Sequence, residues 1–160
     1  MAKNLTMKAK DAVSAKLAEC FLIIEGNRYN FAQAINFEAK FDKNKEKVPI
    51  LGKTGSGNKA TGWEGTGSMT FHYNTSIFRA IAERFKNTGG DIYFDIHVSN
   101  EDPTSAAGRQ TVIFAGCNLD STILAKFDAD GKYLDEDMDF TFEDFYMPQQ
   151  FDTLEEMLAA

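Results

Sequence analysis

The apolar residues of this chain recur mainly at every second position, which is the period of a β-strand with one buried face. Residues 18–25 form a nearly continuous apolar run, so we expect a buried strand there. Gly26 and Asn27 predict a two-residue hairpin turn with glycine at its first central position. Residues 28–41 then alternate between apolar and polar side chains and predict one returning strand of fourteen residues. Strands are usually about 5–6 residues long, so this one indicates a sheet that extends beyond the core of one subunit.

The same period of two returns in the second half of the chain, where further strands are expected. They cover residues 67–73, 91–98, 110–117, 121–127 and 132–146. In the last of them the phase changes at Glu143 and Asp144, which predicts a β-bulge, and Pro148 closes the strand.

One segment follows the helical period of 3.6 instead. Apolar side chains at positions 77, 78, 81, 82 and 85 fall on one stripe and predict a helix that packs on the sheet. Asn74 or Thr75 can cap its start, and Gly89 with Gly90 ends it. About seven strands and one flanking α-helix predict a mainly β fold, a sandwich or barrel. We expect residues 1–160 to form a single domain.

The segment between the first long strand and residue 67 fits neither period. Residues 43–73 hold six of the twelve glycines and five lysines. Such a polar stretch buries too little apolar surface to pack by itself, and structureless loops beyond about 12–15 residues usually have a function. We therefore expect residues 42–66 to be a long extended loop that contacts another subunit. The alternation in residues 65–73 fits a β-arm whose tip meets a neighbour.

Two apolar features interrupt this polar segment, the run Val48–Leu51 and the single tryptophan, Trp63. Exposed apolar groups on a polar excursion are typical of interface anchors. The alternative for Trp63, that its ring folds back on its own domain, stays open. The residues predicted to contact another subunit are Lys43, Lys45, Val48, Ile50, Leu51, Lys53, Lys59 and Trp63.

Charge is divided unequally along the chain, whose net charge is −7. Residues 1–59 carry 11 basic and 6 acidic side chains, and residues 60–160 carry 6 basic and 18 acidic ones. Unlike ends can attract each other in a stack of subunits, whereas a solvated acidic tail is the plain alternative. Residues 1–17 are expected to form a flexible or partner-docked arm. Residues 151–160 form an acidic tail that is compatible with a short helix.

Sequence motifs for chemistry are incomplete. Gly52 and Gly57 have the spacing of a phosphate-binding loop, but Asn58 and Lys59 occupy the positions of its lysine and hydroxyl residue. The acidic run at residues 128–137 fails as a calcium loop, because a lysine stands at its first ligand position. We therefore predict no catalytic residue, no metal and no cofactor, and a protein that is not an enzyme. Neither histidine has a second ligand at metal-binding spacing, and no apolar run is long enough to span a membrane.

Three runs of residues resemble the tail tube proteins of PBSX-like contractile phage tails and of phage-tail-like bacteriocins. They are Lys43-Asn44-Lys45-x-x-Val48-x-Ile50-x-Gly52, then Lys59-x-Thr61-Gly62-x-x-Gly65-Thr66-Gly67-x-x-Thr70-Phe71, and Phe140-Thr141-Phe142-Glu143-Asp144-Phe145-x-x-Pro148. The runs occur in the expected order and separation, and the similarity covers roughly residues 18–150.

The resemblance implies a β-sandwich or barrel with one helix, related in fold to the type VI secretion tube protein. It implies hexameric rings that stack into a hollow inner tube, which is driven through the cell envelope when an outer sheath contracts. The implied partners are other copies of the chain, the tail sheath protein and the baseplate, with DNA only as passing cargo. The implied location is a virion tail or tail-like particle that is assembled in the bacterial cytoplasm.

A polar or acidic channel wall would keep DNA from adhering. The polar face of residues 28–40 or that of residues 137–143 is expected to line it. The candidate residues are Asn30, Asn36, Glu38, Asp137, Asp139 and Glu143. The alternative function is a β-sandwich module that binds a small molecule or carbohydrate through Trp63 and the acidic strand.

Overall fold

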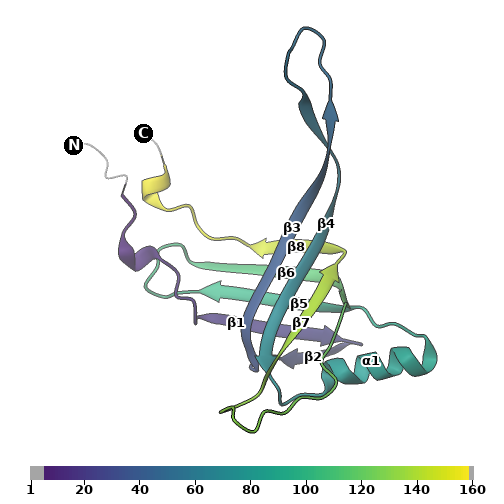
Figure 1. Cartoon of the computed structure of the whole chain (residues 1–160). Coiled ribbons are helices and arrows are strands. Elements are labelled where there is room, and N and C mark those ends of the chain that lie inside the picture. The colour runs from purple at the N-terminus through teal and green to yellow at the C-terminus, as the bar shows by residue number, and fades with distance from the viewer. Residues whose placement is uncertain (1–5, 159–160) are drawn as a thin grey trace. The chain divides into compact units, whose positions relative to one another are not determined.

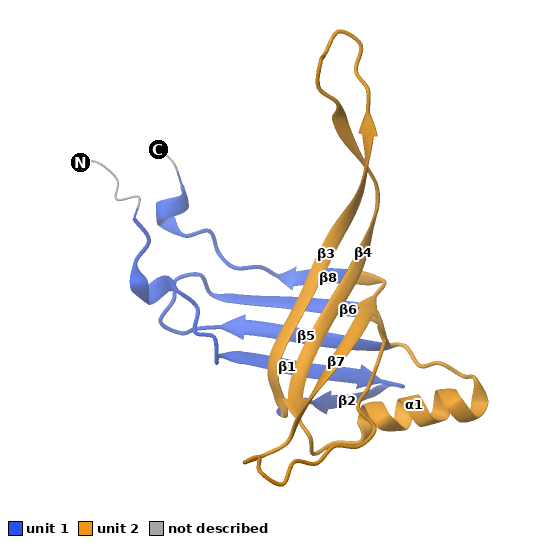
Figure 2. Ribbon diagram, in the orientation of Figure 1, with its two compact units in different colours: residues 1–32, 94–115, 145–160 blue, residues 33–93, 116–144 orange. Residues whose placement is uncertain are grey.

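The computed structural model describes residues 6–158, and these form two compact units (Figure 2). Unit 1 comprises residues up to 32, residues 94–115 and residues from 145 onward. Unit 2 comprises residues 33–93 and 116–144. Each unit is therefore assembled from segments that lie far apart in the sequence.

Unit 1 is built on a sheet with the strand order β2-β1-β5-β6, and β8 also pairs with β6 (Figure 1). The strands are β1 (Ala18–Ile24), β2 (Asn27–Asn30), β5 (Phe94–Glu101), β6 (Arg109–Leu119) and β8 (Asp144–Gln149). Strand β1 pairs antiparallel with both β2 and β5. The buried apolar side chains of this unit include Leu22, Ile24, Phe31, Phe94, Ile96 and Phe114.

The turn between β1 and β2 lies one residue earlier than predicted. Ile24 pairs with Asn27, so the two central residues are Glu25 and Gly26. Their φ angles are 51° and 82°, and both central residues need positive φ in a type I′ turn, which matches the twist of a hairpin. The prediction of Gly26 and Asn27 as the turn is wrong, because the register of the pair fixes which residues remain outside it.

The predicted single strand over residues 28–41 is also wrong. Strand β2 ends at Asn30, and β3 begins only at Ala34. Between them the amide of Phe31 donates to the carbonyl of Cys20 (2.8 Å), and the Phe31 side chain is buried. This hydrogen bond directs the chain away from β2, so the alternation of residues 28–41 is shared by two strands in different units.

Unit 2 contains a three-stranded antiparallel sheet in the order β3-β4-β7, and the end of β6 pairs with β7. Its elements are β3 (Ala34–Val48), β4 (Gly57–His72), α1 (Ile77–Thr88) and β7 (Asp135–Phe142). One face of this sheet is buried. Phe71 on that face is fully buried, and its ring contacts the ring of Phe78 of α1 (centroids 5.4 Å apart). The other buried apolar side chains include Met69, Ile81, Met138, Phe140 and Phe142.

Helix α1 ends where the sequence predicts. Gly89 takes the left-handed conformation (φ 72°), and its amide donates to the carbonyl of Phe85 at 2.8 Å. The start is less regular, because Ser76 occupies the N-cap position without a capping side-chain hydrogen bond. The hydroxyl of Thr75 accepts a long hydrogen bond (3.4 Å) from the amide of Ile77.

A buried ion pair fixes α1 to the sheet. Nη1 of Arg79 donates to Oε2 of Glu136 at 2.7 Å, and the Glu136 side chain is only 1% exposed. The same guanidinium donates to the carbonyls of Thr75 and Ile123 and lies 4.3 Å from the ring centroid of Tyr73. Glu136 thus belongs to the interior of unit 2, although its neighbours in sequence make it look like part of an acidic surface strand.

The second half of the chain departs from the predicted strands at two places. Residues 121–127 form no strand, and the whole connection between β6 and β7 is irregular. The predicted strand over residues 132–146 is divided, because Glu143 separates β7 from β8, and Pro148 lies inside β8. The hydrogen-bonded order begins at β2 and ends at β3, so the described sheet is not closed into a barrel. The mainly β class with one α-helix among the described residues is confirmed.

The described part of the N-terminal segment is hydrogen-bonded to another segment of unit 1. Asp11 ends the short 3-10 helix η1 (Ala9–Asp11) and is buried. Its carboxylate accepts from the amide of Ala106 (2.9 Å), and its carbonyl accepts from the hydroxyl of Ser105 (2.8 Å). The acidic C-terminal segment contains a second such turn, η2 (Glu155–Met157). Residues 1–5 and 159–160 of the predicted arm and tail lie outside the described residues.

Candidate assembly arm and polar sheet face

Residues 42–64, which we call the arm, form an antiparallel hairpin rather than the predicted loop. Strands β3 and β4 pair continuously as far as Val48 and Gly57. The third strand, β7, pairs with β4 only up to Gly65. Beyond that point the two strands pair only with each other, and Figure 1 shows them projecting from the rest of unit 2. The glycine-rich composition predicts a loop and not this hairpin. The hairpin forms because the backbone N–H and C=O groups of each polar strand pair with those of the other strand.

A β-bulge interrupts the arm near its middle. Asn44 pairs with Gly62 and Lys45 with Ala60, so Thr61 is the extra residue. The hydroxyl of Thr61 donates to the carbonyl of Asn44 at 3.2 Å, which holds the bulge in place. Bulges increase the local twist of a hairpin, and here the bulge separates the base of the arm from its distal part.

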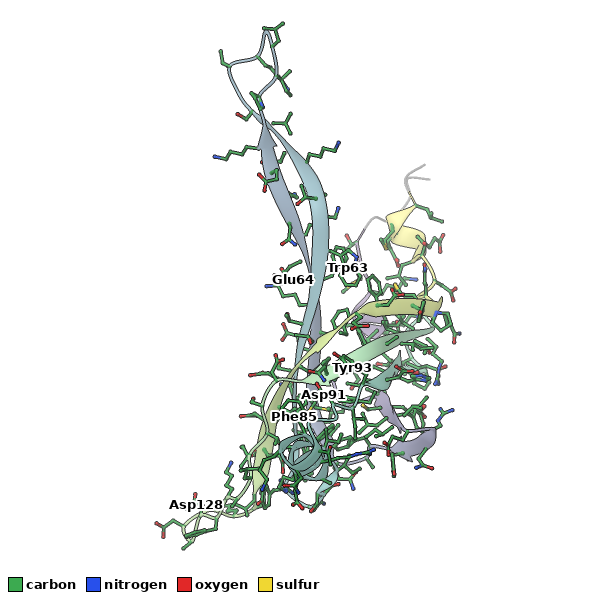
Figure 3. All side chains as sticks on the ribbon, turned by 90° about the vertical axis from the view of Figure 1, so that its right-hand side faces the viewer. Trp63, Glu64, Phe85, Asp91, Tyr93 and Asp128 are labelled. Carbon is green, nitrogen blue, oxygen red and sulfur yellow. The ribbon has the colours of Figure 1, made fainter. Side chains whose placement is uncertain are left out.

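Trp63 belongs to the base of the arm. Its ring stacks on Phe41 (centroids 5.0 Å apart, planes at 27°) and lies 6.1 Å from the ring of Phe142. Figure 3 shows Trp63 and its neighbour Glu64 on opposite sides of the strand. The side chain keeps 37% of its surface exposed. The ring therefore folds back on its own unit, as in the alternative that the sequence left open, and its role in contacts between subunits stays a prediction.

Two glycines at the root of the arm leave space for aromatic rings. Gly65 pairs with Phe142, and Gly67 pairs with Phe140. A Cβ atom on Gly65 would lie 2.3 Å from Cε2 of Phe142, and one on Gly67 would lie 2.3 Å from Cζ of Phe140. The sequence predicts Gly65 in the long extended loop and Gly67 at the start of the strand over residues 67–73, a prediction that overlooks this packing. The signal that could have corrected it is the match between Gly-x-Gly on β4 and Phe-x-Phe on β7.

The distal part of the arm combines apolar and basic side chains. Val48, Ile50 and Leu51 are all exposed, and Leu51 is completely so (104%). Four of the predicted contact residues are lysines, namely Lys43, Lys45, Lys53 and Lys59. These four and Lys47, the other lysine of the arm, are all exposed. Residues 43–59 carry five lysines against a single glutamate, Glu46. The structure thus gathers the residues predicted to contact another subunit on one hairpin.

The polar face of the sheet in unit 2 unites two sets of residues that the sequence treated as alternatives. The register places Glu38, Ser68 and Asp139 in one row across β3, β4 and β7. The neighbouring row consists of Asn36, Thr70 and Asp137, and the hydroxyl of Thr70 donates to Asp137 at 2.7 Å. Directly paired residues point to the same side of a sheet. Four predicted channel-lining residues therefore share one face.

An open hollow of about 410 Å³ lies on this polar face. Carboxylates of Glu38, Asp120 and Asp139 line it, together with Lys40 and the hydroxyl residues Thr66 and Ser68. The other two predicted channel residues lie elsewhere. Asn30 is in β2 of unit 1, and Glu143 occupies the break between β7 and β8.

The remaining titratable candidates do not form a chemical site. Among residues 6–158, no three histidine, cysteine, aspartate or glutamate side chains come together as metal ligands would. Burial lowers the pKa of His97, with a further lowering by Arg28 that Asp95 partly opposes. Burial raises the pKa of the Cys20 thiol to about 11. The described helices also lack the length and apolar character that a membrane crossing requires.

Comparison with known proteins identifies the family. The sequence family described as phage tail tube protein matches residues 5–149. This chain belongs to that family. One curated relative of this tail tube family member is the phage-like element PBSX protein XkdM of Bacillus subtilis (strain 168). It is 36% identical over 146 residues, which are 91% of this chain and 97% of XkdM.

Solved structures of tail tube type share its fold. The anti-feeding prophage baseplate, 6-fold symmetrised, contains a chain with a TM-score of 0.64 and 10% identity. The match covers 85% of this chain and 95% of that one. The SPP1 tail tube matches with a TM-score of 0.61 and 10% identity, over 93% of this chain and 87% of that chain. These similarities confirm the predicted tail-tube type of fold.

Proposed function

We propose that this chain is the structural subunit of an inner tail tube, whose hexameric rings stack into a hollow tube that sheath contraction drives through the target cell envelope. The observation that carries the proposal is the arm. It extends beyond the third strand of its sheet and exposes Val48, Ile50 and Leu51 at its end. Contiguous exposed apolar groups with polar surroundings mark interaction sites, and a second copy of the chain would cover them.

The polar face of β3, β4 and β7 supports a role as channel wall. One face of this sheet is buried and the other is polar, as expected of an antiparallel sheet with a single solvated side. Asn36, Glu38, Asp137 and Asp139 on this face would present carboxylates and amides to the channel. Carboxylates repel the phosphates of DNA, so DNA would pass as cargo without adhering.

The other partners follow from the same proposal. The tail sheath protein would surround the tube, and the baseplate would hold its first ring. We further propose that the subunit acts mechanically rather than as an enzyme, and that it is assembled in the bacterial cytoplasm into a virion tail or a phage-tail-like particle. The family description, phage tail tube protein, supports a structural role.

The alternative function, a module that binds a small molecule or carbohydrate, relies on Trp63 as its main binding residue, and Trp63 does not suit that role. A tryptophan that binds a sugar offers a free ring face, whereas the Trp63 ring stacks on Phe41 and contacts Phe142. No observation on the described residues favours that alternative over the tube.

Electron microscopy of the purified chain at high concentration tests the tube. We expect rings with a central opening and stacks of such rings. Replacing residues 49–56 by Asn-Gly would join Val48 to Gly57 through a two-residue turn and remove the apolar tip. This variant should keep its cooperative unfolding but lose stacking. A control with Thr54→Ala and Ser56→Ala keeps the apolar and basic groups and should stack normally. Discrete particles of the wild-type chain under all salt conditions would contradict the proposal.

Sedimentation of tubes with labelled DNA tests the channel wall. A variant with Glu38→Gln, Asp137→Asn and Asp139→Asn should assemble normally but retain more DNA, because three negative charges per subunit are removed. The control, Glu83→Gln on the exposed side of α1, should retain as little DNA as the wild type. Equal retention by all three proteins would place the polar face elsewhere than in the channel.

A further inference from the structure

A stacking arm requires a surface that receives it, and the proposed function leaves that surface undefined. The exposed side chains of the arm indicate which groups a complementary surface would present. Leu51 is completely exposed (104%) and needs an apolar partner, and the exposed lysines Lys53 and Lys59 need carboxylates. The inference below rests on the proposed function and deepens it.

Residues 120–134, the β6–β7 connection, expose the matching apolar groups. Phe127 is 91% exposed, Tyr133 69% and Leu124 71%. Among the large apolar side chains of the described residues, Leu51 and Phe127 are the two most exposed. A phenylalanine in water at the surface of a monomer leaves its largest apolar area uncovered, so an occupant is expected to bury it.

The charge of the β6–β7 connection also complements the arm. Asp120, Asp128 and Asp130 are exposed. Lys126 is engaged within its own unit, because its ammonium donates to the carbonyl of Asp135 (2.8 Å) and lies 3.4 Å from the carboxylate of that residue. Lys132 is therefore the remaining exposed cation against three exposed carboxylates.

A local turn holds the carboxylate of Asp128 in place and orders the backbone of Asp130 beside it. The amide of Asp130 donates to the carboxylate of Asp128 (3.1 Å), and the amide of Gly131 donates to the Asp128 carbonyl (3.2 Å). An ordered turn costs less entropy on docking than a disordered segment does. The surface next to Phe127 is thus formed before any partner arrives.

The arm and the β6–β7 connection lie at opposite ends of unit 2. Figure 3 shows Asp128 at the end of the unit that is remote from the tip of the arm. A contact between two different patches of identical subunits is heterologous, and it repeats from copy to copy instead of closing on itself. Patches at opposite ends of one unit suit a stack in which every subunit both gives and receives an arm.

We infer that the β6–β7 connection is the docking surface for the arm of a second copy of this chain. Leu51 packs against Phe127 and Leu124, and the lysines of the arm face Asp128 and Asp130. The acidic C-terminal segment is the rival receiver, because it also combines carboxylates with an exposed apolar side chain, Met157.

Disulfide trapping between two copies distinguishes the receivers. One sample carries Lys53→Cys in the arm, and a second carries Ala129→Cys in the β6–β7 connection. The apolar side chains Leu51 and Phe127 are unchanged in both. A third sample carries Thr153→Cys in the C-terminal segment as matched control. Oxidation should give a covalent dimer only when the first two are mixed. A dimer with Thr153→Cys instead of Ala129→Cys overturns the inference. Cys20, whose thiol pKa is raised to about 11, and the buried Cys117 should remain unreacted, and the wild-type chain checks this.

Stacking of variants gives an independent measurement. Phe127→Ser should leave single rings intact and weaken stacking roughly 30-fold, as expected for the loss of an interface hot spot. Phe85→Ser, which changes another exposed aromatic residue of unit 2, should leave stacking unchanged. Lys53→Glu and Asp128→Lys should each weaken stacking, and the double variant should recover it.

The outcomes separate this inference from the proposed function. Stacks of Phe127→Ser as long and as numerous as those of the wild type would overturn the docking surface and leave the tube intact. A wild-type chain that forms neither rings nor stacks would overturn both.

Discussion

Alanine at the root of the arm gives the sharpest test of how the sheet of unit 2 is packed. Gly65→Ala would place a methyl group 2.3 Å from Cε2 and 2.4 Å from Cζ of Phe142. Carbon atoms normally lie about 3.5–4.0 Å apart, so more than an ångström of overlap has to be relieved by moving the ring or the strand. The prediction is that this substitution destabilises the chain.

Two opposing terms decide the size of the effect. Replacing glycine in a strand restricts the unfolded chain and stabilises by about 0.4–1 kcal/mol where the residue fits. Overpacking of a filled core costs typically about 1–3 kcal/mol. The overlap at Gly65 is severe, and its partner Phe142 is itself buried, so the second term prevails. We expect a net loss of about 1–2 kcal/mol.

Urea unfolding measures this loss, with Gly62→Ala as the matched control. A Cβ on Gly62 would meet its nearest neighbour, Nδ2 of Asn44, at 3.9 Å, which is ordinary contact. With a slope of about 1–3 kcal/mol per molar urea, Gly65→Ala should lower the unfolding midpoint by roughly 0.5–1 M, and Gly62→Ala should leave it unchanged or raise it. Phe142→Leu in the Gly65→Ala background should recover part of the loss. Equal midpoints for Gly65→Ala and Gly62→Ala would refute the packing argument.

The other predictions concern single side chains. Arg79→Ala should lower the free energy of unfolding by about 3–5 kcal/mol, because it leaves the carboxylate of Glu136 buried without its cation; a urea midpoint close to wild type would contradict this. His97 has a lowered pKa in the folded chain, so the unfolded chain binds more protons below pH 6.5 and stability falls as the pH drops through that range. His97→Gln should flatten this slope in unfolding experiments, and an unchanged slope would show that other groups cause it. Cys20, with a thiol pKa of about 11 in place of 9.0, should react with iodoacetamide at pH 8 about 100-fold more slowly in the folded than in the unfolded chain. A folded-state rate that levels off near pH 9 would speak against the raised pKa.

Local patterns in the sequence predict the elements whose partners lie nearby. Strand β1 and the end of α1 at Gly89 agree with the structure, because apolar clustering and a left-handed glycine act within a few residues. The shared polar face of Asn36 and Asp137 was predicted as two separate faces. Alternation shows that each strand has such a face, but only the register across β4 shows that the two are one.

The errors of the sequence-based prediction arise from partners that are remote in sequence. The break after Asn30 depends on a hydrogen bond from Phe31 to Cys20, which no local pattern encodes. The sequence pattern predicts a loop for the arm, because each of its two polar strands is stable only when paired with the other. Residues 121–127 looked like a strand because Ile123 and Phe127 are apolar, yet Phe127 lies in solvent. This last error coincides with the proposed docking surface, where apolar residues serve a partner and not the interior.

The hairpin geometry of the arm determines how it transmits tension. A pull on the tip between Val48 and Gly57 acts on both strands in the same direction, so the covalent backbones of β3 and β4 share it. The hydrogen bonds between the two strands are then neither sheared nor peeled apart. The force reaches the root of the arm, where Trp63 stacks on Phe41 and β4 pairs with β7. The arm is therefore a two-stranded tether, and its mechanical strength depends on the packing at its root.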